Sequence, residues 1–203
     1  TYKLAIAAAD MGTGCDTILA QMAAECLHVT TDEIFVSGAD TDSSPYDSGS
    51  YASSTTYITG QAVVKAATEL EKRICQVAAG MLECDPEDVE FDGRKATDVK
   101  TGKSVTSEEI GYKAQVCNEI ALQVTESHSS PVSPPPYMAG AVEIELDKET
   151  GHVEILDYAA VVDCGTVVNP NLATVQVEGG LGQGIGMTLY ENIQYTEKGK
   201  LIN

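Results

Sequence analysis

Apolar positions in the first eighty residues follow a strand pattern first and a helical pattern afterwards. Residues 2–9 alternate like a strand, and the glycines that follow end it. A helix is predicted next, which Asp16 is expected to cap, with one apolar face formed by Ile18, Leu19, Met22, Ala23 and Leu27. Residues 33–37 predict a second strand, and a long helix is predicted from Ser54 or Thr55 to Leu82, where Gly60 indicates a close contact.

The rest of the chain alternates between hairpin signals and helical signals. Residues 89–105 predict a strand-turn-strand unit, and Ser107 begins another predicted helix. Four prolines and four serines in residues 126–136 predict a loop or a seam between two lobes, and the consecutive prolines exclude a helix there. Further elements are predicted as a hairpin (139–146 and 152–162), a glycine-rich helix (172–189) and a closing strand (192–195).

This order of elements predicts an α+β fold with two lobes, residues 1–130 and 131–203. A strand, a glycine-containing loop and a helix occur near both ends of the chain, in residues 2–27 and 153–190. We therefore expect two related strand-loop-helix units whose loops face a shared cleft.

Composition and charge narrow the possible partners. The chain has 203 residues, 43% of them hydrophobic, with no apolar run that would span a bilayer. Its net charge is -19 with only 12 lysines and arginines, which argues against binding nucleic acid. An anionic ligand must therefore be held by backbone N–H groups and hydroxyls.

Neither the cysteines nor the acidic residues predict a metal centre. The six cysteines form no Cys-x-x-Cys pair, so we expect buried, reduced thiols in a cytoplasmic protein. Asp40, Asp42 and Asp47 lack the glycine and the glutamate of a calcium loop and are expected to cap turns. The three histidines neighbour no candidate nucleophile, and no catalytic residue is predicted. A start at Thr1 without an initiator methionine leads us to expect a fragment of a longer polypeptide.

Three runs of small, amide and hydroxyl residues suit the binding of a large polar cofactor: residues 11–17, 51–57 and 176–184. Gly12 and Gly14 stand between a predicted strand and a predicted helix, where unpaired N–H groups would donate to a phosphate or a carbonyl, or where the chain simply turns tightly. Thr17 stands where a dinucleotide-binding loop needs Gly or Ala. The hydroxyls of residues 53–56 either contact a ligand or cap the helix. The glycines after Gln176 allow a ligand or another backbone to approach.

Taken in order, the three runs resemble the molybdopterin-binding part of the large subunit of molybdenum hydroxylases, the xanthine dehydrogenase and aldehyde oxidase family. Residues 133–171 also match, through Pro-Pro-Tyr-x-x-Gly-Ala, Asp163-Cys164-Gly165 and Val168-Asn169-Pro170. The resemblance implies that the cofactor is bound by Gly12, Thr13, Gly14, Ala52, Ser53, Ser54, Thr55, Thr56 and Gln176.

The same resemblance implies a function for the complete enzyme. It would hydroxylate an N-heterocycle such as a purine, or an aldehyde, with water as the oxygen source. Iron-sulfur clusters and FAD would lie on other domains or subunits, and the remaining segments of the large subunit would complete the pocket. The catalytic glutamate belongs to a Gly-Glu motif, and no Gly-Glu pair occurs in residues 1–203. We therefore expect the isolated chain to be inactive.

Two positions depart from the family pattern, which usually has Gln in place of Thr13 and Arg in place of Ser54. These differences favour an alternative: a non-catalytic α/β binding or assembly module that retains the glycine-rich scaffold. A nucleotide-binding dehydrogenase domain is a third possibility, for which the glycine pattern is poor.

Overall fold

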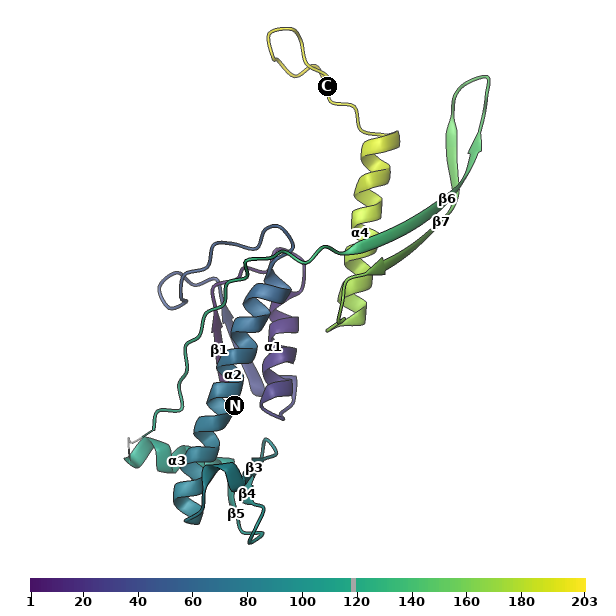
Figure 1. Ribbon diagram of the computed structural model, residues 1–203. Coiled ribbons are helices and arrows are strands. Elements are labelled where there is room, and N and C mark those ends of the chain that lie inside the picture. The colour runs from purple at the N-terminus through teal and green to yellow at the C-terminus, as the bar shows by residue number, and fades with distance from the viewer. Residues whose placement is uncertain (118–119) are drawn as a thin grey trace. The chain divides into compact units, whose positions relative to one another are not determined.

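The computed structural model describes residues 1–117 and 120–203, which form two compact units, Thr1–Ser133 and Pro134–Asn203. Helices and strands are mixed in both units (Figure 1), so the α+β prediction is confirmed. No helix within these ranges combines the length and the apolar character needed to cross a membrane.

A parallel pair of strands opens the first unit. β1 (Tyr2–Ile6) pairs with β2 (Ile34–Gly38), with Tyr2 opposite Ile34. Parallel strands need a crossover connection, and α1 (Cys15–Cys26) supplies it. The predicted strand over residues 2–9 is thus too long, because β2 ends opposite Ile6 and leaves the next residues without a strand partner.

The predicted long helix is α2 (Thr55–Leu82), which packs along α1. The two helices approach closely at Gly60, where an added Cβ would lie 2.7 Å from Met22 Sδ. The close contact expected at this glycine is therefore confirmed. Leu19 and Ala23 of α1 and Val63 and Ala67 of α2 are all buried, and they contribute to the core of this unit.

Near its C-terminal end α2 contacts a small antiparallel sheet (Figure 1). Its strands are β3 (Val89–Phe91), β4 (Lys95–Asp98) and β5 (Ser104–Thr106), and α3 (Ser107–Cys117) follows. The structure thus has three strands where strand-turn-strand is predicted, because residues 89–105 contain two turns. Phe91, Ala96 and Ile110 are buried in this part.

The second unit is a long hairpin and a helix. β6 (Tyr137–Leu146) pairs with β7 (Val153–Asp163), and the Asp147 carboxylate accepts hydrogen bonds from Glu149 N and Thr150 Oγ1 in the turn. α4 (Pro170–Leu189) follows, with the Asn169 side chain accepting from Leu172 N at its start. None of the residues of β6 or α4 is buried.

The proline-rich segment before β6 is free of helix and strand from residue 120 to residue 136, as its sequence predicts. The predicted closing strand over residues 192–195 is wrong. The hydrogen bonds of the turn at residues 196–200 bring Tyr195 opposite Leu201, and these two residues form an isolated bridge instead of a strand pair.

Candidate cofactor-binding site

Two of the three predicted runs meet at one edge of the β1–β2 pair. The loop with Gly12 and Gly14 follows the carboxyl end of β1, and the loop before α2 follows the carboxyl end of β2. Two hydrogen bonds tie them: the Ser44 hydroxyl donates to Ile6 O at 2.8 Å, and the Ser50 hydroxyl donates to Ala9 O at 3.4 Å. The carboxyl edge of parallel strands is where ligands bind in open α/β sheets.

The glycine loop is closed by Asp10, a residue that the sequence reasoning missed. The Asp10 carboxylate accepts from Gly12 N at 2.9 Å and from Gly14 N at 3.1 Å, and these bonds hold its pKa below the usual range. The expectation of unpaired N–H groups is therefore wrong for these two glycines. An aspartate two residues before a glycine is a recognised turn signal, so the sequence contains a hint of this arrangement.

The cap of α1 also differs from the prediction. Gly14 occupies the N-cap position with φ 76°, in the left-handed region that favours glycine. Asp16 lies inside the first turn instead, where a negative charge is favourable but where its side chain does not cap the helix.

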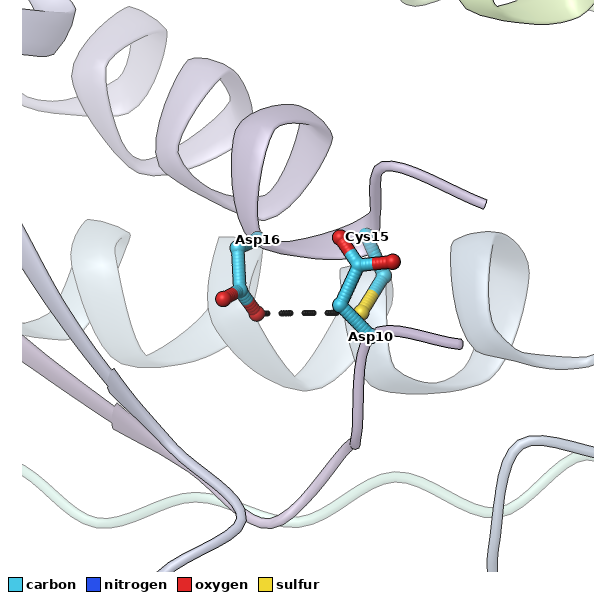
Figure 2. A group of neighbouring side chains, drawn as sticks. All are labelled: Asp10, Cys15 and Asp16. Carbon is cyan, nitrogen blue, oxygen red and sulfur yellow. Dashed lines mark hydrogen bonds between the residues drawn. The ribbon is translucent and has the colours of Figure 1, made fainter. Parts of the chain in front are cut away.

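Three side chains gather at this helix start, as Figure 2 shows: Asp10, Cys15 and Asp16. The Cys15 thiol donates to Asp16 Oδ1 across 3.7 Å. Burial, followed by the charges of Asp10 and Asp16, raises the pKa of Cys15 to about 11. A metal-binding cysteine must be a thiolate, so these charges favour a neutral thiol packed at the helix start.

We expect Cys15 to resist alkylation. At pH 8 a thiol of pKa about 11 has a thiolate fraction about two hundredfold below that of an ordinary cysteine, and burial slows the reagent further. Cys117 and Cys164 are exposed, so the expectation of buried thiols is wrong for these two, and they should react first. Mass spectrometry after a timed iodoacetamide treatment measures the order, with a guanidinium-denatured sample as the control. Cys15 labelling as fast as Cys164 in the folded chain would contradict this description.

The start of α2 combines backbone strain with free hydroxyls. Ala52 and Ser53 have φ 53° and 56°, which non-glycine residues rarely adopt. The Ser54 hydroxyl donates back to Tyr51 O at 2.7 Å, so the helix cap expected from this run does not form. Within the described ranges the hydroxyls of Ser53, Thr55 and Thr56 have no hydrogen-bond partner, and strain of this kind often accompanies ligand sites.

Replacing Ala52 by glycine tests that strain. We expect Ala52→Gly to raise the free energy of unfolding by about 0.5–1 kcal/mol, because relief of the left-handed strain exceeds the added entropy of the unfolded chain. Ala62→Gly, within α2, is the control and should lower it by about 1 kcal/mol. Urea denaturation followed by circular dichroism measures both. A destabilised Ala52→Gly variant would show that the strain is absent.

The third run lies in the second unit, on α4. Gln176 is exposed in the second turn of this helix. An added Cβ at Gly179, Gly180, Gly182 or Gly184 would meet no atom of the described chain within 4 Å. Packing within the second unit therefore does not explain the glycines, although each costs the helix about 1 kcal/mol relative to alanine.

A surface depression of about 420 Å³ lies elsewhere. It runs along α1 and β2, lined by Asp16, Thr17, Gln21, Asp32 and Val36 among others. A smaller one of about 290 Å³ lies on α2, beside Lys65 and Glu126. None of the predicted cofactor-binding residues lines either of these two depressions.

Comparison with known proteins identifies the class. Residues 1–203 match the family model described as "Molybdopterin cofactor-binding domain", and the chain belongs to this family. The resemblance seen in the sequence is thereby confirmed.

Individual relatives extend the comparison. The probable hypoxanthine oxidase XdhD of Escherichia coli K12 is 34% identical over 200 residues, covering 98% of this chain and 21% of the relative. The crystal structure of the Cu,Mo-CO dehydrogenase matches with a TM-score of 0.89 and 28% identity, over 98% of this chain and 26% of that one. Quinoline 2-oxidoreductase from Pseudomonas putida 86 matches with a TM-score of 0.85 and 27% identity, over 99% and 26%. The chain thus spans about a fifth to a quarter of these proteins.

Proposed function

We propose that this chain holds the pterin cofactor of a molybdenum hydroxylase through the glycine loop, the start of α2 and Gln176. The enzyme would hydroxylate an N-heterocycle such as a purine, or an aldehyde. The observation that carries the proposal is the family match over the whole chain, because it includes all three segments. The names of two matched proteins, a hypoxanthine oxidase and a quinoline oxidoreductase, favour the N-heterocycle.

The residues present fit a large polar cofactor. The hydroxyls of Ser53, Thr55 and Thr56 are unpartnered in the described chain and stand where the first N–H groups of α2 point outward. Hydroxyls both donate and accept, which suits the mixed hydrogen-bonding edge of a pterin. The open glycines of α4 allow close approach beside Gln176, whose amide can also donate and accept.

When bound, the cofactor would supply the oxidation chemistry, with oxygen taken from water. This chain's residues would hold and orient it. The left-handed conformation of Ala52 and Ser53 holds the hydroxyl residues at the start of α2 in one arrangement. Less conformational entropy is then lost when the cofactor binds. The Thr13 hydroxyl has no hydrogen-bond partner in the described part of the chain, so it offers a further contact from the glycine loop.

The proposal includes partners. Further segments of the large subunit would complete the pocket, and iron-sulfur and FAD subunits or domains would accept the electrons. The chain's net charge of -19 argues against nucleic acid as a partner.

Oxidation in ¹⁸O-labelled water tests the proposal. The complete polypeptide that contains this chain, purified with its co-expressed partners, is incubated with hypoxanthine, quinoline and benzaldehyde and with an artificial electron acceptor. We expect turnover of at least one substrate with ¹⁸O in the product. A well-folded complex that oxidises none of them and contains no molybdenum would support the alternative, a non-catalytic module, which the departures at Thr13 and Ser54 favour.

A further inference from the structure

One edge of β2 has no partner strand. Among the strands that the structure describes, only β1 pairs with β2, although parallel sheets are usually buried in larger assemblies of strands and helices. Just after β2, Ala39 donates its N–H to Ile6 O of β1. Because N–H groups alternate in direction along a strand, those of Val36 and Gly38 face away from β1. Neither has a hydrogen-bond partner in the described chain.

The depression of about 420 Å³ along α1 and β2 lies beside this edge. Its apolar lining comes from Ala20 of α1 and from Ile34 and Val36 of β2, and β1 contributes none of the lining residues. A strand that paired with Val36 and Gly38 would direct every second side chain to the same face of the sheet as Val36. Those side chains would enter the depression, so the edge and the depression together suit an extended segment.

The charge of the depression defines the chemistry of that segment. Asp16 and Asp32 line it, Glu33 follows directly in sequence, and none of the described lining residues is a lysine, an arginine or a histidine. Lysine or arginine beside the apolar side chains of the segment would complement these carboxylates. A second copy of this chain would be repelled instead, since each copy has a net charge of -19.

The length of the relatives indicates where such a segment comes from. This chain spans 21% of the probable hypoxanthine oxidase and 26% of the CO dehydrogenase chain that it matches. A strand that belongs to the same polypeptide is held near β2 at a high effective concentration, so it needs little affinity of its own.

We propose that an extended segment of the polypeptide outside residues 1–203 adds as a strand to the free edge of β2. Its apolar side chains fill the depression, and a lysine or an arginine lies beside Asp16 and Asp32. The inference rests on the part of the proposed function that places this chain in a longer polypeptide.

Hydrogen exchange of the complete polypeptide, purified with its partners and resolved to single residues by mass spectrometry, tests the pairing. Phe35 and Ser37, whose N–H groups face β1, are the internal controls. We expect Val36 and Gly38 to be protected as strongly as these controls, at least about a hundredfold over an unstructured peptide. An alternating pattern, in which Val36 and Gly38 exchange as fast as an unstructured peptide, would overturn the proposal.

A photo-cross-linker in place of Thr17 identifies the source of the segment, because Thr17 is exposed and lines the depression. Lys113, exposed on α3, is the control position. In the complete polypeptide we expect Thr17 to give cross-linked peptides from outside residues 1–203, and Lys113 to give none of these peptides. Cross-links from Thr17 only to residues 1–203 or to a separate subunit, or none at all, would also overturn the proposal.

A charge reversal tests the basic character of the segment. Asp32→Lys should speed the exchange of Val36 and Gly38 about fivefold, the effect of replacing an attraction by a repulsion at an exposed site. Asp42→Lys is the matched control, since Asp42 is equally an exposed aspartate but lies away from the depression. Equal exchange in the two variants would contradict a basic partner. These measurements need no cofactor or turnover, so their failure is distinct from failure of the proposed function, which ¹⁸O incorporation tests.

Discussion

The purified 203-residue chain is expected to contain far less than one molybdenum atom per molecule and to oxidise neither a purine nor an aldehyde. A cofactor held by many weak hydrogen bonds loses affinity steeply when some of its contacts are missing, since the remaining loops must be ordered with less compensation. The Gly-Glu pair of the catalytic base does not occur in residues 1–203. Positioned proton transfer alone contributes roughly a hundred- to ten-thousand-fold in rate.

Metal analysis measures the molybdenum content of the chain. An oxidation assay with an artificial electron acceptor measures its activity. The control is the complete polypeptide expressed in the same cells, which shows that the host supplies the cofactor. Stoichiometric molybdenum with turnover would show that the 203-residue chain contains the complete site, and would contradict the prediction.

Gly93→Ala is expected to have the largest effect on stability. Gly93 lies in the β3–β4 turn with φ 87°, and an added Cβ would lie 2.0 Å from His28 O, just beyond the C-terminal end of α1. Both atoms of His28 near it belong to the backbone, so no side-chain rotation relieves the overlap. We expect the free energy of unfolding to fall by about 3 kcal/mol, as measured by urea denaturation.

Substitutions at two other glycines distinguish the effect of steric overlap from the effect of backbone conformation. Gly102 has φ 71° but open space around it, so Gly102→Ala should cost only about 1–2 kcal/mol of strain. Gly80, inside α2, has open space and an ordinary φ, so Gly80→Ala should stabilise the chain by about 1 kcal/mol. If Gly93→Ala lowers the free energy of unfolding no more than Gly102→Ala does, the close contact with His28 is wrong.

Helical periodicity predicted the elements best. The bounds of α2 follow from its apolar repeat, and the contact with Met22 explains the glycine that interrupts it. Hairpin signals were equally informative for β6 and β7, because turn residues and alternation indicate the same register. The ends of elements were less predictable: β1 ends where its partner strand ends, which a single sequence does not reveal.

The candidate site was predictable in its residue types and not in its conformation. Small and hydroxyl residues in a loop-to-helix setting indicated the glycine loop and the start of α2, and the topology brings these two to one edge. The left-handed Ala52 has no sequence signal, because alanine does not favour that conformation. Asp10, two residues before Gly12, is a local turn signal, but the N–H groups from which its carboxylate accepts are seen only in the structure.

The proposed binding of the cofactor by the glycine loop, the start of α2 and Gln176 is measured most directly by cofactor content. Molybdenum and pterin are determined per molecule of the complete polypeptide, for the wild type, Thr56→Ala, Gln176→Ala and Gln183→Ala. The last variant is the control, since Gln183 is also exposed on α4 and is not among the nine residues expected to bind the cofactor. Because one lost hydrogen bond lowers affinity by about tenfold, Thr56→Ala and Gln176→Ala should each contain several-fold less cofactor than the wild type, while Gln183→Ala should match it. Full cofactor content in both site variants would contradict the account.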